Sequence, residues 1–172
     1  MLFIKEFTHN ITLSPSDLGK DLKKIIKIKL INQVTGTCNE KFGYYIKVIN
    51  IGEIKNGFIL EGSGNIIFKM TYKVVLLRPF KNEVSDGIVH QITGGNILVK
   101  VGPMVVFIEK NKIPQDFEYD AKNECYKNKK DSSDIIKVGE KVRFKYIEIQ
   151  YSPNEFRPIG TMFEKYLGHI KE

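Results

Sequence analysis

A proline near the middle of the chain constrains the fold more than any other feature. Tyr72–Leu77 reads as a strand of six residues, Arg78-Pro79 interrupts it, and Glu83–Val89 follows at once as a second strand-like run. Proline cannot donate a hydrogen bond to a sheet ladder, and it favours extended geometry in the residue before it. We therefore expect the chain to pass directly from one sheet into another here, with residues 1–80 and 81–172 forming two domains.

The second half predicts a small all-β barrel. Short strand-like runs follow one another at Ile97–Val101, Val105–Glu109 and Val142–Ile149, and a Gly102-Pro103 turn joins the first two. Short runs separated by turn residues are typical of small barrels.

Three segments of the second half do not read as strands. Glu118–Asp134 is polar and rich in lysine, asparagine and aspartate, so we expect a long surface loop there. Two short pieces without strand character are expected near Lys112–Asp116 and Met162–Leu167.

The first half predicts a small sheet with one helix. Alternation predicts a strand from Phe3 to Leu13, and the helix is expected to start at Ser14-Pro15-Ser16-Asp17, because serine can cap a helix and proline suits its first position. The apolar stripe of this helix, over residues 16–33, comprises Leu18, Leu22, Ile25, Ile26, Leu30 and Val34. Further strands are expected at Phe42–Ile51, Asn56–Leu60 and Ile66–Leu77. The resulting βαβββ order has one helix fewer than a βαββαβ RNA-recognition module.

Positive charge is concentrated in the first half. The net charge is +7, and residues 1–80 carry 12 basic and 6 acidic side chains, whereas residues 81–172 carry 15 and 14. The helix supplies much of the excess through Lys20, Lys23, Lys24, Lys27 and Lys29. A solvated helix face explains most lysines of this kind. Because the second half is nearly neutral, RNA binding there needs a local basic patch.

Several classes of protein are disfavoured. The apolar runs are too short for a membrane span, and the N-terminus lacks the layout of a signal peptide, so we expect an intracellular protein without membrane contact. Cys38 and Cys125 are solitary, which disfavours a disulfide framework and a zinc site. His9, His90 and His169 have no acid or thiol at a useful spacing, so we assign no catalytic residue, no metal and no cofactor.

Four stretches together are specific to one family. They are Val34-Thr-Gly36-Thr-Cys38 with Gly43-Tyr44; Tyr72-Lys73 and Arg78-Pro79-Phe80-Lys81 with Glu83, Val84 and Asp86; Val101-Gly102-Pro103-Met104 with Phe107-Ile108 and Ile113-Pro114; and Ile159-Gly160 with Tyr166-Leu167-Gly168. The chain resembles the family of the seventh subunit of eukaryotic RNA polymerase II, which has a counterpart in the RNA polymerase of archaea. The resemblance covers essentially the full length.

The resemblance implies an α+β protein: a truncated RNP-like tip domain followed by an all-β OB-fold barrel. It implies a nuclear, non-catalytic stalk subunit that pairs with the fourth polymerase subunit. Such a subunit docks on the core polymerase beside the RNA exit channel and binds the emerging single-stranded RNA. The open alternative is a free-standing OB-fold RNA-binding protein of translation or RNA decay.

Candidate site residues follow from this resemblance. For RNA binding we expect Lys100, Phe107, Lys110, Lys112, Arg143, Lys145, Tyr151 and Arg157. For docking on the polymerase by tip loops we expect Ser14, Pro15, Gly19, Gly62, Gly64 and Asn65. For the partner subunit we expect Tyr44, Tyr45, Tyr72, Arg78 and Phe80. The sequence leaves open whether Phe107 is a stacking platform or a core residue, and whether the basic residues are only solvated surface.

One position departs from the usual pattern of such barrels. The second barrel strand usually begins with glycine followed by an aromatic residue, and this chain has Asn96 and Leu98 there. Asn96 follows Gly94-Gly95 and is able to adopt the left-handed conformation that the turn requires. Leu98 cannot stack on a base, and stacking is worth roughly 1–3 kcal/mol per base, so we expect weakened RNA binding.

Overall fold

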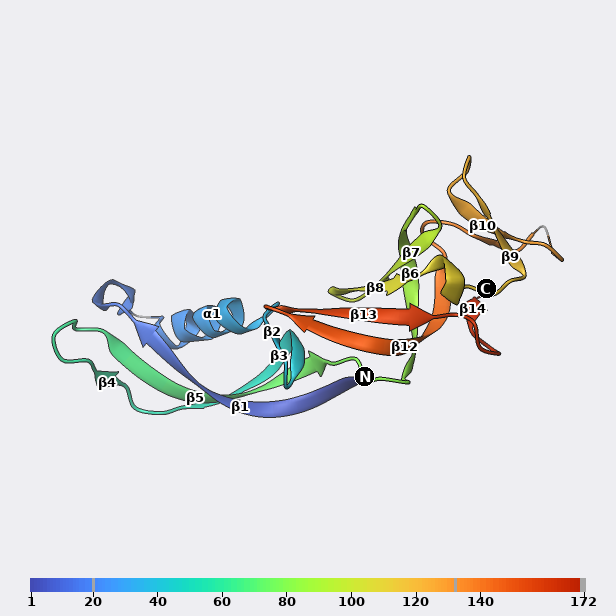
Figure 1. Ribbon diagram of the computed structural model, residues 1–172. Helices are drawn as coiled ribbons and strands as arrows, with labels where there is room; N and C mark the ends of the chain where they lie inside the picture. Colours follow the sequence, from blue (N-terminus) through green and yellow to red (C-terminus); the bar gives the residue numbers. More distant parts are fainter. Residues whose placement is uncertain (20, 132, 171–172) are drawn as a thin grey trace. The chain divides into compact units, whose positions relative to one another are not determined.

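The computed structural model describes residues 1–19, 21–131 and 133–170, and the chain divides into two compact units (Figure 1). Leu2–Arg78 form one, called the N-terminal unit below, and Pro79–Glu172 with Met1 form the other, the C-terminal unit. The division falls at the Arg78-Pro79 bond. The predicted α+β class is confirmed, because an α-helix accompanies a sheet in the first unit, and the regular structure of the second unit, among the described residues, is strands and one short 3₁₀ helix.

The N-terminal unit is built on a five-stranded sheet of order β1-β5-β3-β2, with β4 beside β5. Its strands are β1 (Leu2–Leu13), β2 (Cys38–Asn39), β3 (Gly43–Ile54), β4 (Phe58–Ile59) and β5 (Ile66–Leu77). The long strands agree with the alternation in the sequence, and β1 pairs with β5 without a bulge from Leu2↔Leu77 to Leu13↔Ile66. β4 is shorter than expected, and β2 has too few residues to show a period.

The helix starts later than the sequence suggested. Pro15–Asp17 form a separate 3₁₀ turn, η1, and the helix α1 spans Leu22–Val34. Asp17 closes this turn, since its Oδ2 accepts hydrogen bonds from Ser14 Oγ at 2.8 Å and from Lys29 Nζ at 2.5 Å. These bonds, that of the lysine first, lower the pKa of Asp17 to about 2. The capping residues therefore belong to a turn that precedes the helix, and Lys20, expected inside the helix, lies outside the described residues.

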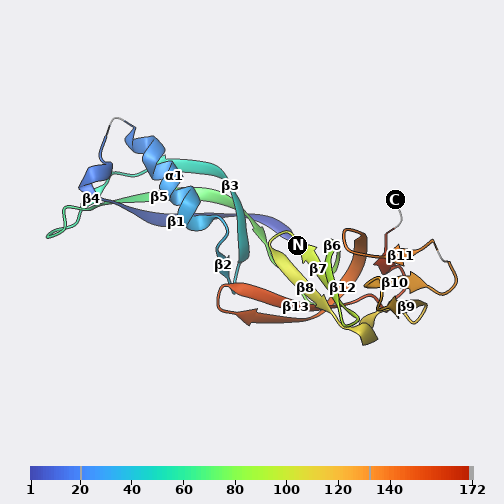
Figure 2. The same ribbon diagram turned by 90° about the horizontal axis from the view of Figure 1, so that it is seen from above.

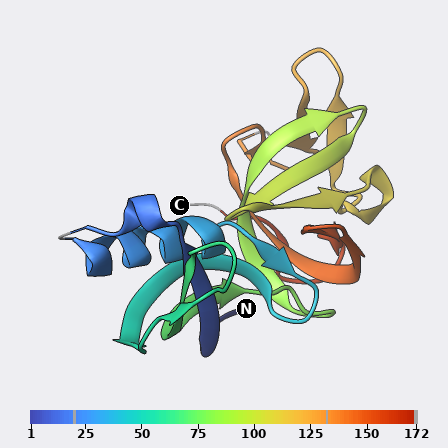
Figure 3. The same cartoon turned by 90° about the vertical axis from the view of Figure 1, so that its left-hand side faces the viewer.

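One face of α1 packs on the sheet (Figures 2 and 3). Ile26, Leu30 and Val34 are buried and form one core with strand residues such as Ile11 and Val74, which are fully buried. Burying apolar surface at about 25 cal/mol per Å² supplies most of the stabilisation of such a layer. Among the stripe residues only Leu18 lies elsewhere: it precedes α1 and is exposed.

The C-terminal unit contains a closed barrel. Its six strands are β6 (Val84–Thr93), β7 (Asn96–Val101), β8 (Met104–Ile108), β12 (Lys141–Ser152), β13 (Glu155–Thr161) and β14 (Gly168–His169). They lie in the order β13-β8-β7-β6-β12-β14, and an additional pairing of β13 with β12 closes the sheet on itself. The short helical piece is η2 (Lys110–Lys112), slightly earlier than expected, and residues 162–167 form no helix.

The prediction of a long surface loop at Glu118–Asp134 is wrong. This segment and its flanks form a second, three-stranded sheet of order β11-β10-β9, made by β9 (Phe117–Asp120), β10 (Cys125–Asn128) and β11 (Ile135–Ile136). Tyr126 is buried and pairs with Tyr119. Many of the polar residues serve the turns instead: Asp120 accepts hydrogen bonds from the backbone N–H of Lys122 and from Asn123 Nδ2. Because lysines are interspersed between these short strands, their apolar alternation was not recognised in the sequence.

Within the part of the chain that the structure describes, no helix is long and apolar enough to cross a membrane.

Candidate nucleic-acid interface

Two neighbouring barrel strands, β7 and β8, present four side chains on the outside of the barrel. Their inward side chains, which include Ile97, Val99, Val106 and Ile108, are fully buried. The outward ones are Leu98, Lys100, Val105 and Phe107, called the β7–β8 face below. Leu98 lies directly opposite Phe107, and Lys100 lies opposite Val105.

Phe107 is a surface residue, since 36% of it is exposed. This settles its orientation: the ring is not part of the barrel core. A half-exposed aromatic ring beside a lysine can stack on a base while the lysine contacts a phosphate, which is the usual way that barrels of this type hold single strands. Leu98 is less exposed and offers only an apolar contact.

Lys110 and Lys112 follow β8 on η2. The backbone N–H of Lys110 donates a 3.1 Å hydrogen bond to Asn96 Oδ1, which ties η2 to the start of β7. Asn96 thus acts as a hydrogen-bond acceptor, and it does not adopt the left-handed conformation available to it, since Gly94 and Gly95 take the positive φ angles of 58° and 88° in this turn. The ammonium groups of Lys100, Lys110 and Lys112 form no ion pair with any described residue.

The other three basic candidates are ion-paired. Arg143 binds Asp86 through two hydrogen bonds, Nε to Oδ1 at 2.6 Å and Nη2 to Oδ2 at 2.8 Å. These bonds lower the pKa of Asp86, as expected of a carboxylate beside a guanidinium. Lys145 donates to both carboxylate oxygens of Glu164, and Arg157 donates to Glu155. A phosphate would have to compete with these carboxylates, so each pair weakens the contribution of its basic member.

Tyr151 lies on the β12–β13 hairpin, away from the β7–β8 face. It is 37% exposed and packs on Phe156, with 5.2 Å between ring centroids. Ile159 of β13 is the residue that lies beside Phe107. The structure therefore brings together Lys100, Phe107 and Lys110 and leaves Tyr151 apart from them.

The docking candidates gather at one end of the N-terminal unit. Gly62 and Gly64 have φ angles of 85° and 67°, in the turn that joins β4 to β5. A Cβ on Gly64 would lie 3.5 Å from Pro15 Cγ, so this turn and η1 are neighbours. Asn65 closes the turn, because its carbonyl accepts a 2.7 Å hydrogen bond from Leu60 N.

Sequence reasoning missed an apolar patch beside these glycines. Phe58, Ile59 and Leu60 are 69%, 71% and 39% exposed. Together with Ser14, Pro15, Gly62, Gly64 and Asn65 they form what is called the tip surface below. The missed signal is a run of three large apolar residues in a segment too short to contribute to a core. Gly19 is exposed beyond η1.

The expectation of partner contacts is wrong for two tyrosines. Tyr44 and Tyr72 are only 7% and 4% exposed. Tyr72 belongs to the core beneath α1, and burial raises its pKa. Tyr45 is half-buried, with its ring 5.5 Å from that of Phe7. Tyr72 and Tyr45 pack in the core that also contains the buried residues of α1.

Two partner candidates remain at the surface. Arg78 donates a 2.6 Å hydrogen bond to the carbonyl of Lys41, and Phe80 is 41% exposed. The sequence missed Leu2 and Ile4, which are 63% and 62% exposed on the edge strand β1. Exposed apolar side chains on an unpaired edge are typical of a surface that another chain covers.

One histidine has acidic neighbours that its sequence spacing did not reveal. His169 Nδ1 lies 2.6 Å from Asp134 Oδ1, and Nε2 lies 3.5 Å from Glu140 Oε2. Asp134 also accepts a hydrogen bond from Asn128, so the cluster ties β14 to the three-stranded sheet. No group of three or more histidine, cysteine or acidic side chains among the described residues is placed to hold a metal ion.

Comparison with known proteins adds two domain matches. Residues 8–64 match a family described as "SHS2 domain found in N terminus of Rpb7p/Rpc25p/MJ0397", and residues 78–156 match "S1 RNA binding domain". The second match contains the whole β7–β8 face and η2.

Curated relatives are similar over almost the entire chain. DNA-directed RNA polymerase II subunit RPB7 of Saccharomyces cerevisiae is 37% identical over 174 residues, which cover 99% of this chain and 100% of the relative. The protein of the same name in Schizosaccharomyces pombe is 34% identical, with 96% and 97% covered. That of Dictyostelium discoideum is 31% identical, with 99% of each covered.

Proposed function

The chain belongs to the RPB7 family of RNA polymerase II subunits, and we propose that it is the stalk subunit that guides nascent single-stranded RNA across the outside of its barrel. The observation that carries this proposal is the β7–β8 face. Lys100 and Phe107 are diagonal neighbours there, Lys110 lines a shallow hollow together with Phe107, and no carboxylate of a described residue is paired to either lysine. Neither matched domain is described as catalytic, so the contribution of this protein is binding.

Salt dependence tests RNA binding by the barrel. Each phosphate neutralised on a single strand contributes about −0.7 to the slope of log affinity against log salt. With Arg143, Lys145 and Arg157 held by carboxylates, Lys100, Lys110 and Lys112 remain for about three phosphates, so we expect these three lysines to contribute about −2 to the slope. Titration of a fluorescent oligouridylate at several salt concentrations measures it. A slope near −6 or no binding at all would contradict the proposal.

The apolar tip surface is proposed to dock on the core polymerase. Phe58 and Ile59 are large, exposed and adjacent to two tight turns, which fits insertion into an apolar groove of a large partner. The fourth polymerase subunit is proposed to cover the other exposed apolar residues: Leu2 and Ile4 on β1, and Phe80. This assignment places the protein in the nucleus, where the polymerase transcribes.

Replacing Gly64 with valine is expected to weaken docking on the polymerase about tenfold. Its φ of 67° is sterically unfavourable for a β-branched residue, so the β4–β5 turn must change shape. Retention of the purified chain on immobilised core polymerase measures the loss. Gly139→Val is the matched control, since Gly139 has a φ of 95° and open space around it in the C-terminal unit. Equal retention of the two variants would show that the tip surface is not part of the docking site.

Replacing Leu98 with phenylalanine is expected to strengthen RNA binding about fivefold or more. The new ring would lie opposite Phe107 on the same face, and a stacked base adds roughly 1–3 kcal/mol. Fluorescence titration with the same oligouridylate measures the gain. Val138→Phe is the control, because Val138 is 57% exposed and lies outside the β7–β8 face. An unchanged or lower affinity of Leu98→Phe would show that bases do not reach this pair.

A single purification separates this proposal from the free-standing alternative. A polymerase subunit co-purifies with polymerase II and the fourth subunit, whereas a factor of translation or decay co-purifies with ribosomes or free RNA.

A further inference from the structure

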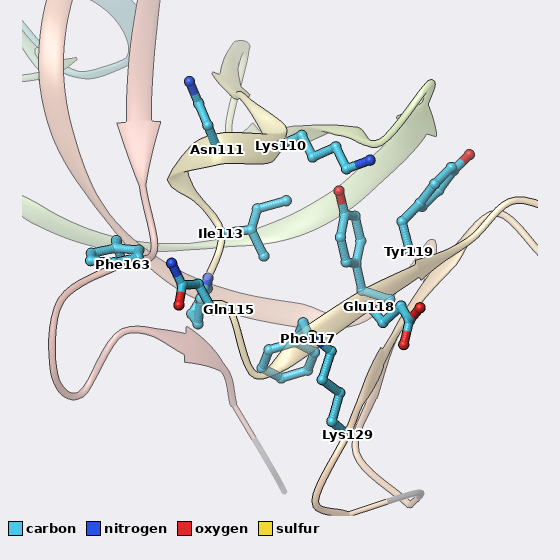
Figure 4. Close-up of a pocket in the computed structure, with 11 residues that line it drawn as sticks. Lys110, Asn111, Ile113, Gln115, Phe117, Glu118, Tyr119, Lys129 and Phe163 are labelled. Atoms are coloured by element: carbon cyan, nitrogen blue, oxygen red, sulfur yellow. The ribbon is translucent and has the colours of Figure 1, made fainter.

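A cleft of about 600 Å³ opens in the C-terminal unit between η2 and the three-stranded sheet (Figure 4). Its lining includes Lys110, Ile113, Phe117, Tyr126, Lys129 and Phe163. Ligand pockets in proteins are typically about 300–1,000 Å³, so the cleft is large enough for a nucleotide. It is not part of the β7–β8 face.

The floor of the cleft is rigid and apolar. Ile113 and Tyr126 are only 5% and 2% exposed. The hydroxyl of Tyr126 donates a hydrogen bond to the carbonyl of Gly95, which fixes the ring between the barrel and the small sheet. Burial raises the pKa of Tyr126 to about 12, so the hydroxyl keeps its proton and this bond at physiological pH.

The walls combine aromatic rings with two lysines. Phe163 is 58% exposed, and Phe117 and Tyr119 are partly exposed on the opposite wall (Figure 4). Lys110 and Lys129 line the same cleft and are not ion-paired to any described residue, and Glu118 is the one acidic side chain of the lining.

The lysines near the cleft differ in whether a carboxylate is paired with them. Lys127 and Lys130, on either side of Lys129 in the sequence, are paired with Asp120 and Asp116 at 2.7 and 2.8 Å. Lys129 lies near both of them without such a carboxylate among the described residues, and it lines the cleft. Unneutralised ammonium groups beside exposed rings favour an anionic ligand with flat faces.

The cleft is continuous with the β7–β8 face. Lys110 and Asn111 line the cleft and also a shallow hollow whose other lining residues are Asn96, Phe107 and Glu109. A strand lying on the β7–β8 face can therefore continue over η2 into the cleft without leaving protein surface.

We propose that this cleft is a second subsite for single-stranded RNA, which receives a base from the strand on the β7–β8 face. The base lies against Phe163, and Lys110 and Lys129 contact the flanking phosphates. The proposal rests on the proposed function, since it extends the RNA path of the barrel. Rings on both walls distinguish a base from an acidic peptide, which would use the lysines alone.

Matched aromatic variants of the full chain test the subsite. With a fluorescent oligouridylate of about 12 nucleotides, within the range of about 4–16 nucleotides that such folds cover, Phe163→Leu is expected to lower affinity about fivefold or more. Phe163→Tyr keeps a flat ring and is expected to bind as the parent does. Tyr166→Leu is the control, because Tyr166 is 93% exposed, three residues along the chain, and outside the cleft. Equal affinities of Phe163→Leu and Tyr166→Leu would overturn the proposal.

A charge reversal completes the test. Lys129→Glu is expected to make the salt slope shallower by about 0.7, one phosphate on a single strand. Lys122→Glu has the same change of charge in the β9–β10 turn and is expected to leave the slope unchanged. Polyglutamate that displaces the RNA from the parent and from Phe163→Leu equally well would identify an acidic-peptide site and overturn the RNA subsite.

The outcomes separate the subsite from the RNA role of the barrel. If Lys100→Glu weakens RNA binding and the Phe163 and Lys129 variants do not, the cleft is not an RNA subsite, and RNA binding by the β7–β8 face is retained. If the parent chain binds no RNA, both are wrong.

Discussion

Changing Lys100 and Lys110 together to glutamate is expected to lower the affinity for single-stranded RNA about 25-fold or more at about 0.1 M salt. Each lost phosphate contact removes about 0.7 of the salt slope, which is about fivefold at 0.1 M. Two lost contacts multiply to about 25-fold, and repulsion between the new carboxylates and the phosphates adds to this. The slope itself is expected to become shallower by about 1.4, which is two phosphate contacts on a single strand.

A second double variant controls for net charge. Lys122→Glu with Lys165→Glu changes the charge of the C-terminal unit equally, and both side chains are exposed away from the β7–β8 face. It is expected to bind RNA nearly as the parent does. Equal losses in the two double variants would mean that the barrel binds RNA only through its overall charge. A loss found instead in Lys23→Glu with Lys24→Glu would move the site to α1.

Replacing Phe144 with alanine is expected to destabilise the C-terminal unit by about 3–5 kcal/mol, the range for a buried phenylalanine. Phe144 is fully buried on β12, and its ring meets that of Tyr146 edge-on at 5.2 Å between centroids. A Cβ on Gly160 would lie 3.0 Å from Phe144 Cδ2, so the ring fills the space beside this glycine of β13. The cavity that Phe144→Ala would leave lies between β12 and β13, where the barrel closes.

Denaturant unfolding monitored separately in the two units measures this effect, because two units do not necessarily unfold as one cooperative step. Phe163→Ala is the control: it deletes the same ring at a site that is 58% exposed, and its cost is expected to be small. If the two variants lose the same stability, the packing attributed to Phe144 is wrong.

Periodicity predicted the long strands of the N-terminal unit and most barrel strands, but not β13, which closes the barrel. Apolar alternation located β1, β5, β7 and β8 to within a residue or two, because each has one buried face and one exposed face. It failed for β9–β11, where lysine and aspartate serve turns and mask short strands. It also misplaced the start of α1, since the capping residues of η1 are the same types that begin a helix.

The candidate sites were harder to predict, for a physical reason. Alternation shows that two faces exist but not what covers them, so the sequence could not tell that Tyr72 faces its own helix and Phe107 faces solvent. Ion pairs between distant strands are equally hidden: Asp86 and Arg143 are 57 residues apart, yet they remove a basic residue from the predicted RNA site. The cleft could not be foreseen, because it depends on a sheet that the sequence presented as a loop.

In a transcribing polymerase, the β7–β8 face is expected to contact the nascent RNA. The most direct test of this contact places a photoreactive amino acid at Phe107 or, as the control, at Val138, which is 57% exposed and outside the β7–β8 face. Polymerase II carrying each variant is stalled with a radiolabelled transcript that has emerged from the enzyme, and then irradiated. We predict that the transcript crosslinks to the Phe107 variant and not to the Val138 variant. Crosslinking at Val138 alone, or at neither position, would show that the transcript does not contact the β7–β8 face.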